Sequence, residues 1–400
     1  MAKWASFNQF LAEANRAPEQ SRQTMVDQLL LEHPTFPWIE GSLATFVFTG
    51  IGVERVGVNL DIIESDPPFI AMQQLEGTTL WYAQRRFKPD DLLDYLLVVD
   101  DPMTPIANEK NLLQRIARYW RVDPRNQMRM STAQMEVSIM RMPQARPFPD
   151  WQRFDVPHGQ IFEHEFSSVQ MNFQNRKLWV YTPPEYGQDP DRSYPMLVLF
   201  DGQWMLGPLQ VPYIADTLIK HGRMQPVIIA MLQSGTHAQR VTDFISNDKY
   251  YAAILTELLP FLQSEYWIDS TDLGIGGVDV GAIAAAYAAL KNPAVFSHLI
   301  MLSPPLGKGQ AQERLLEYAE RFEKARLLPE RIFQSVGRYE QANRFYKPGL
   351  ALGLILQRRE IDKQDIDHEF IEQGSGHGLV AFKAALPEAL AHIFPAKVQA

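Results

Sequence analysis

Length, composition and charge place this chain among globular proteins and exclude several other classes. Its 400 residues are 46% hydrophobic and 21% charged, which is enough chain for two or three domains with buried cores. The formal net charge is −9 and no cluster of lysine and arginine occurs, so we expect no nucleic-acid-binding surface. The absence of cysteine excludes disulfides, thiolate metal ligands and a cysteine nucleophile.

The first residues, "MAKWASFNQFLAEANRAPEQ", carry charges throughout and lack the apolar centre of a signal peptide. Nowhere do about 18 apolar residues follow one another, as a membrane-spanning helix requires. We therefore expect a cytoplasmic protein with no membrane partner. No self-complementary patch stands out, so the sequence predicts no oligomeric state.

Residues 1–35 are predicted to form a helical segment. Apolar side chains recur at helical spacing on either side of a break at "RAPEQ". Residues 36–150 are predicted to form a β-sandwich followed by a connector. The β-rich runs are short and are separated by Gly, Pro and Asp; they read "ATFVFTG", "VERVGVNL", "LWYAQRRF" and "DYLLVVD". From residue 101 the chain is dotted with proline and predicts an irregular connector.

Residues 151–400 are predicted to form an α/β domain with a mostly parallel sheet covered by helices on both faces. Apolar strands alternate with amphipathic helical stretches such as "YYAAILTELLPFLQSEY" and "ERLLEYAERFEKARL". The predicted strands are residues 177–184, 195–202, 226–232, 273–278, 298–303, 331–336 and 368–373. In such a sheet, functional residues belong at the carboxyl ends of the strands.

The stretch "GIGGVDVGAIAAAY" predicts a nucleophile elbow, the sharp strand-to-helix turn of α/β-hydrolases. The pattern is Gly-x-nucleophile-x-Gly, and Asp279 occupies the central position where serine is usual. Gly277 and Gly281 leave room for the turn, and the alanines that follow let the helix lie close to the sheet. The same letters only partly match a dinucleotide-binding fingerprint, because Asp279 stands at its third glycine.

The remaining members of a catalytic triad are expected later in the chain, in the order acid and then histidine. Glu340 in "GRYEQANRF" and His377 in "GSGHG" each follow a predicted strand, which is where these two groups belong. An oxyanion hole needs two backbone N–H groups. Val280 is expected to supply one, and Gln203 or Trp204, after "PMLVLFDG", the other.

His158 and His164, in "PHGQIFEHEF", are the candidate metal ligands of the sequence. Their spacing near a predicted strand favours surface histidines over a metal site.

Taken together, these motifs resemble the enterochelin esterase family, hydrolases of iron-siderophore trilactones related to the esterase D group. The likeness rests on "LWVYTPPEY", "YPMLVLFDGQW", Arg240 ahead of "ELLPFL", "GGVDVGAIAAAYAALKNPAVFSHLIMLSP", "VGRYEQANR", "GSGHG" and the N-terminal "DPRN…MEVSIMRMPQA". It implies an immunoglobulin-like domain, an α/β-hydrolase domain and a Ser–acid–His triad without a metal or organic cofactor. His377 matches the histidine of the family and Glu340 its acid. Arg240 either faces the substrate, as the family pattern suggests, or lies on a surface helix.

Asp279 departs from the pattern of the family at the nucleophile itself. A carboxylate is a weak nucleophile toward an ester carbonyl, and its charge competes for the N–H groups of the oxyanion hole. Removing the nucleophile of a triad costs about 10⁶ in kcat. One hypothesis is a protein that keeps a pocket for an ester or siderophore-like small molecule with little or no ester turnover. The alternative is a hydrolase that uses Asp279 as nucleophile at saturated carbon, or as a base for water, with His377 and Glu340.

Overall fold

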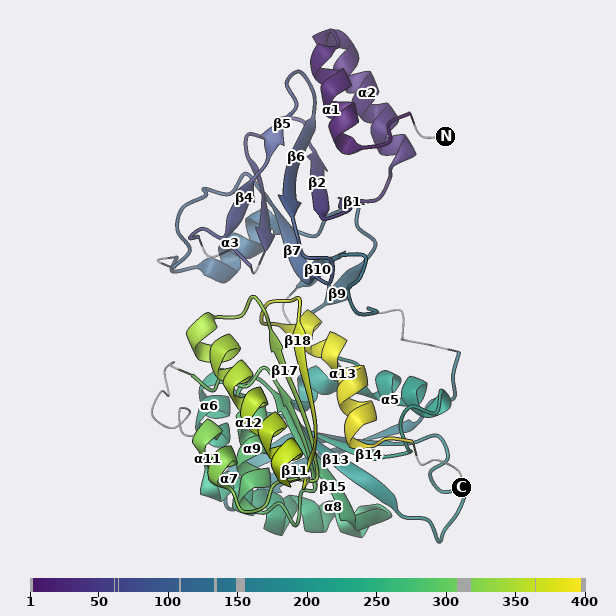
Figure 1. Ribbon diagram of the computed structural model, residues 1–400, viewed down its shortest axis with the longest axis vertical. Helices are drawn as coiled ribbons and strands as arrows, with labels where there is room; N and C mark the ends of the chain where they lie inside the picture. Colours follow the sequence, from purple (N-terminus) through teal and green to yellow (C-terminus); the bar gives the residue numbers. More distant parts are fainter. Residues whose placement is uncertain are drawn as a thin grey trace. The chain divides into compact units, whose positions relative to one another are not determined.

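The computed structural model divides the chain into two compact units (Figure 1). One unit is Met1–Arg146 with Gly374–Gly376, and the other is Pro147–Gln373 with His377–Ala400. The structure describes residues 3–60, 62–63, 65–107, 109–132, 135–148, 155–307, 318–363 and 365–396. The domain boundary predicted at residues 150 and 151 lies outside these ranges, as do the first residues of the predicted helical stretch 313–327.

The N-terminal unit begins with two helices, α1 (Phe7–Arg16) and α2 (Glu19–Glu32). Within the described residues it then forms a four-stranded sheet of order β1-β2-β6-β5 and a six-stranded sheet of order β4-β3-β7-β10-β9, with β8 beside β7. All strand pairs in both sheets are antiparallel. The strands are β1 (Trp38–Glu40), β2 (Leu43–Thr49), β3 (Val56–Leu60), β4 (Phe69–Ala71), β5 (Gln73–Gln74), β6 (Leu80–Arg86), β7 (Leu92–Val99), β8 (Trp120–Arg121), β9 (Arg129–Ser131) and β10 (Glu136–Arg141).

Strand β2 shows why this unit holds two sheets and a helical layer. Its central residues are buried on both faces, although successive side chains of a strand point to opposite sides. Phe46 contacts Tyr95 of β7, with ring centroids 5.0 Å apart, and so joins the two sheets. Val47 packs into an apolar cluster with Phe7, Phe10 and other residues of α1 and α2. The helical segment predicted from the first residues therefore covers the outer face of the first sheet.

The stretch 101–150, which the sequence analysis treats as an irregular connector, contains regular structure. It holds helix α3 (Leu112–Tyr119) and strands β8 to β10, and β10 pairs with β7 inside the six-stranded sheet. The described prolines of this stretch lie outside the helix and the strands. The number of prolines in this stretch therefore led to the wrong prediction of an irregular connector.

The second unit is an α/β domain. In its described residues an eight-stranded sheet has the order β11-β12-β14-β13-β15-β16-β17-β18. The β11–β12 and β12–β14 pairs are antiparallel, and every pair from β14 to β18 is parallel. The strands are β11 (Gln160–Ser168), β12 (Phe173–Thr182), β13 (Tyr194–Phe200), β14 (Ile228–Leu232), β15 (Ile268–Val278), β16 (His298–Leu302), β17 (Arg331–Gly337) and β18 (Asp367–Gln373).

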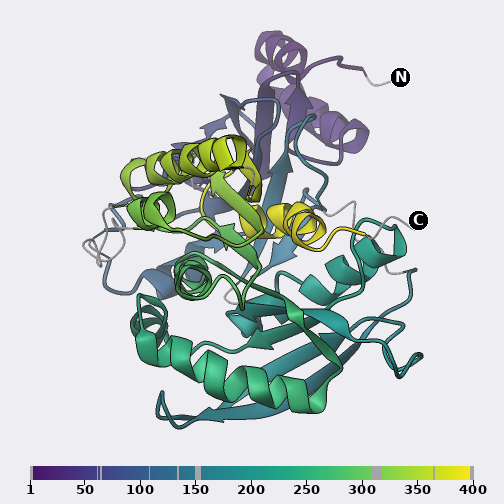
Figure 2. The same cartoon turned by 60° about the horizontal axis from the view of Figure 1, so that its bottom comes forward.

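Helices cover both faces of this sheet (Figure 2). Helix α13 packs against α5, whereas α9 packs against α6, and α11 against α12. The helices are α4 (Gly202–Leu206), α5 (Val211–Lys220), α6 (His237–Phe244), α7 (Asp248–Ala253), α8 (Leu259–Glu265), α9 (Val280–Lys291), α11 (Tyr318–Lys324), α12 (Lys347–Lys363) and α13 (Leu379–Ile393), with π-helical turns η1 (Ile254–Leu258) and η2 (Ala342–Tyr346). The predicted fold class, an N-terminal β-sandwich and an α/β-hydrolase domain, is confirmed.

Strand β11 is absent from the predicted strands because most of its residues are exposed and show no apolar run. It carries His164, whose Nε2 lies 2.6 Å from the Tyr266 hydroxyl, and His158 precedes it with Nδ1 2.9 Å from Asp216. In the described part of the chain no group of His, Asp and Glu is arranged to hold a metal ion. None of the described helices combines the length and the apolar character needed to cross a membrane.

Candidate active site

Asp279 lies at the turn between β15 and α9, with φ 50° and ψ −126°. This backbone conformation is costly for a residue with a side chain, and it persists only where the surroundings impose it. The imposition is visible at Gly277: a Cβ there would lie 2.5 Å from the carbonyl carbon of Gly281. Strand and helix therefore meet as closely as glycine allows, and the turn raises the Asp279 carboxylate from the sheet edge with 19% of its side chain exposed.

Glu340 and His377 come from the loops after β17 and β18, at the same edge of the sheet. His377 Nδ1 lies 3.2 Å from Glu340 Oε1, and the Glu340 side chain is fully buried. In the tautomer that carries its proton on Nδ1, His377 donates to Glu340, and Nε2 faces away from Glu340. His377 Nε2 lies 3.8 Å from Asp279 Oδ1, which is beyond a direct hydrogen bond. The structure thus brings the three predicted side chains together.

The His377 ring is held by aromatic neighbours. Its centroid lies 4.4 Å from that of Phe345 in η2, with the two planes 34° apart. Phe382 of α13 presents its ring at 86° to the imidazole, with centroids 5.3 Å apart. With Glu340 behind Nδ1 and rings on two sides, the imidazole is fixed toward the elbow.

Arg240 of α6 joins the elbow to a second, buried carboxylate. Its Nε and Nη2 atoms donate to the two oxygens of Asp201, each at 2.7 Å. Its Nη1 donates to Asp279 Oδ2 at 2.9 Å, and Nη2 also donates to the Val278 carbonyl at 3.1 Å. The Trp204 ring covers the guanidinium, 4.7 Å from the centroid. Arg240 therefore faces the site and does not lie on an exposed helix face.

Burial by itself lowers the pKa of the Arg240 guanidinium, but the hydrogen bonds and charges of Asp201 and Asp279 outweigh it and raise that pKa. Arg240 is a permanent cation that neutralises part of the negative charge of the site. The bidentate geometry on Asp201 fixes its position. Asp279 therefore accepts a hydrogen bond from a guanidinium whose position Asp201 has already fixed.

The two candidate oxyanion donors in the α4 region differ. The Trp204 N–H donates to the Asp201 carbonyl at 2.7 Å, so it is committed to the turn. The Gln203 side chain is anchored to Ser234, donating from Nε2 to Oγ at 2.7 Å and accepting the Ser234 N–H at 3.1 Å. As far as the structure describes the chain, the backbone N–H groups of Gln203 and Val280 donate to no protein acceptor. These two groups remain available for an oxygen of a ligand.

Asp201 and Ser234 are the residues near the site that the sequence analysis missed. Asp201 lies near the end of the predicted strand 195–202, in "LFDGQW", and directly follows β13, so its place at the carboxyl edge of the sheet was a usable signal. It adopts φ 58° and is fully buried. No local pattern marks Ser234 as a partner of Gln203.

The comparison with protein families decides the membership of the chain. The family model named Esterase and described as "Putative esterase" matches residues 168–393, which is more than half of the chain. The chain belongs to this esterase family. A curated relative, the uncharacterized protein YjcH of Bacillus subtilis (strain 168), is 28% identical over 160 residues, 38% of this chain and 64% of that protein. The chain thus spans just under two thirds of that relative.

Solved structures of enterobactin esterases share the fold of this esterase-family chain. Fes of Shigella flexneri, crystallised in the presence of enterobactin, is 19% identical over 88% of this chain and 92% of its own, with a TM-score of 0.71. The ferric enterobactin esterase of Salmonella typhimurium is 18% identical over 88% of this chain and 93% of its own, with a TM-score of 0.72. The resemblance predicted from sequence is confirmed for the family and the fold.

Proposed function

We propose that this esterase-family protein binds an ester or siderophore-like small molecule at the elbow and has little or no serine-type esterase turnover. The observation that carries the proposal is the Asp279–Arg240 ion pair at 2.9 Å, at the position where a triad needs a hydroxyl. A carboxylate held by a guanidinium is a poorer nucleophile than a free one. Its attack on an ester would also have to expel an alkoxide and leave a mixed anhydride, which is unfavourable.

The ligand of the proposal is supported by the binding features that remain at the site. The N–H groups of Val280 and Gln203 suit a carbonyl oxygen, and the Trp204 ring, which covers Arg240, is only partly buried. Asp279 and Glu340 disfavour a carboxylate product, so a neutral ester or amide suits the centre better than an acid. The structurally similar Fes of Shigella flexneri was solved with enterobactin, which makes a siderophore the first ligand to test.

A second candidate function is supported by the register of Asp279, His377 and Glu340. In this alternative, Asp279 Oδ1 attacks a saturated carbon and forms an alkyl ester. A C–halogen bond breaks to release the halide ion, or an epoxide C–O bond breaks and its oxygen takes a proton from water. A water deprotonated by His377 Nε2 then attacks the ester carbonyl, which releases the alcohol and restores the carboxylate. His377 Nε2 and Asp279 Oδ1, 3.8 Å apart, can face the same water. Asp279 acting as base for a water is the remaining variant of this alternative.

The test combines turnover with binding on the wild-type protein. We expect no hydrolysis of p-nitrophenyl acetate or enterobactin, no labelling by a fluorophosphonate, and saturable binding of enterobactin in calorimetry. Ester hydrolysis by wild type that disappears in His377→Ala would contradict the proposed lack of turnover. Absence of enterobactin binding would contradict the proposed class of ligand.

The alternative is tested with an epoxide and an alkyl halide in ¹⁸O water. Turnover with ¹⁸O in the Asp279 carboxylate establishes the covalent route. Turnover with an unlabelled carboxylate leaves Asp279 only the role of a base. No turnover of either substrate rejects the alternative.

A further inference from the structure

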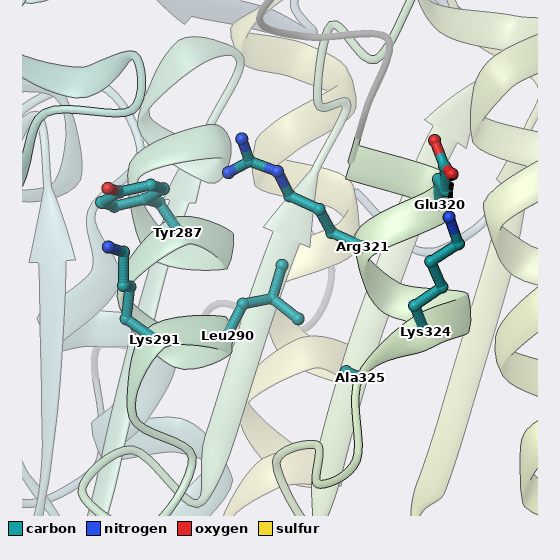
Figure 3. A pocket seen from close by; sticks show the side chains of 7 residues that line it. All are labelled: Tyr287, Leu290, Lys291, Glu320, Arg321, Lys324 and Ala325. Atoms are coloured by element: carbon teal, nitrogen blue, oxygen red, sulfur yellow. Dashed lines mark hydrogen bonds and ion pairs between the residues drawn. The ribbon is translucent and has the colours of Figure 1, made fainter.

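A pocket lies between the C-terminal half of α9 and helix α11, apart from the elbow (Figure 3). Its volume is about 470 Å³, within the range of pockets that hold small organic ligands. Leu290 and Ala325 contribute apolar surface, and Tyr287 contributes a ring with its hydroxyl. The α9 residues of the pocket lie two or more helical turns beyond Asp279, so it does not share the reacting centre.

The charges of the pocket have the opposite sign to that of the whole chain. Three cations line it, namely Lys291, Arg321 and Lys324, against one carboxylate, Glu320, in a chain of net charge −9. Lys324 and Glu320 form an ion pair at one end. Arg321 extends its guanidinium from α11 toward the α9 side, where Tyr287 and Lys291 lie (Figure 3).

Lys291 already has a weak anionic partner. Asp248 of α7 accepts hydrogen bonds from the Tyr287 hydroxyl at 2.6 Å and from Lys291 Nζ at 2.9 Å. The Asp248 side chain is 74% exposed and Lys291 45%, and exposed pairs of this kind contribute little energy. The α9 side of the pocket therefore shows that a carboxylate can be held there by a hydroxyl and an ammonium together.

We propose that this pocket binds an organic anion, a carboxylate or phosphate joined to an apolar or aromatic group. The anionic group lies between Arg321 and Lys291, and the apolar part lies on Leu290 and Tyr287. Arg321 suits such a group because its planar guanidinium can hold two oxygens at once. The site is independent of the function proposed for the elbow, because none of its residues belongs to that centre.

The test measures binding of four probes by calorimetry: benzoate, phenyl phosphate, inorganic phosphate and benzyl alcohol. We expect saturable binding of the first two, weaker binding of inorganic phosphate and none of benzyl alcohol. If benzoate and phenyl phosphate differ, the tighter one identifies the anionic group. Arg321→Gln should weaken binding about tenfold or more, because it removes a charge-assisted hydrogen bond.

Asp248→Asn should tighten binding, because it removes the carboxylate that competes for Lys291 and Tyr287. Arg358→Gln, on the exposed face of α12, is the matched control and should leave binding unchanged. An affinity that is the same in Arg321→Gln and Asp248→Asn as in wild type would overturn the proposal, as would absence of saturable binding. Opposite shifts in two folded variants cannot arise from loss of structure.

Discussion

Arg240 is 4% exposed and donates hydrogen bonds to two carboxylates, those of Asp201 and Asp279. Asp201 has no exposed side-chain surface, so its charge depends on Arg240 for compensation. A buried pair of this kind adds little net stability compared with apolar residues, but removing one partner is costly because the other charge stays buried. The Asp279 carboxylate is therefore bound by a guanidinium whose removal would leave Asp201 buried without a compensating charge.

The first prediction concerns this ion pair. Arg240→Met should lower the free energy of unfolding by about 3–5 kcal/mol, since Asp201 is left buried and uncompensated. Urea denaturation followed by circular dichroism measures the change. The double variant Asp201→Asn/Arg240→Met should recover part of the loss, because neither charge of the Asp201–Arg240 pair remains. A cost below about 1 kcal/mol for Arg240→Met would contradict the role assigned to the pair.

The sequence predicted the positions of some site residues and not those of others. The positions of Asp279, Glu340 and His377 follow from strands whose carboxyl ends share one edge, so their proximity was predictable. Arg240 was left open between site and surface, because a short helix with few apolar residues does not reveal which face is buried. The pairing of Arg240 with Asp279 requires coordinates.

At the scale of elements, helix α13 carries a buried lysine that no described carboxylate compensates. Lys383 is 5% exposed, and its Nζ donates to Gln210 Oε1, at the start of α5, at 2.6 Å. Burial lowers the pKa of Lys383 to about 8. The unfolded chain, with an ordinary lysine pKa near 10.4, binds this proton more tightly than the folded protein does. Stability should therefore rise as the pH rises from about 8 to about 10.

The second prediction tests this dependence. Lys383→Met should be more stable than wild type at pH 7, and the difference should shrink between pH 8 and pH 10 as the wild-type amine loses its proton. Chemical denaturation at a series of pH values measures both proteins. Lys220→Met, at an exposed position of α5, is the control and should show no such trend. If the difference in unfolding free energy between Lys383→Met and wild type stayed constant with pH, the prediction would be wrong. Protonated Lys383 would then not destabilise the folded protein.

The elements themselves were predicted unevenly, for physical reasons. The parallel strands were found because burial on both faces makes them continuous apolar runs, as in β13 and β16. Strand β11 was missed because it is an exposed edge strand, and β10 because it lies in a longer stretch that is dotted with proline. Strands of this kind are stabilised by pairing with neighbouring strands, and the apolar pattern of their own sequence does not reveal them.

At the scale of the whole molecule, the hydrolase sheet gathers side chains from residues 201 to 377 at one edge. The order of motifs along the chain, elbow, then acid, then histidine, was sufficient to predict which strands would contribute them. The sequence could not predict the pocket between α9 and α11, because the pocket depends on how the end of a buried helix faces a second helix. Family membership specifies the scaffold, and in the function proposed above the residue at position 279 decides which chemistry the scaffold can perform.

Asp279→Ser is the most direct test of the central claim that the elbow, His377 and Glu340 are in register and that the carboxylate alone withholds esterase turnover. The variant should hydrolyse p-nitrophenyl acetate at least about 100-fold faster than wild type, because a serine there gains His377 as its base. A fluorophosphonate should label residue 279, Asp279→Ala should stay inactive, and adding His377→Ala should abolish the gain. A correctly folded Asp279→Ser protein that neither hydrolyses the ester nor takes the label would contradict the account.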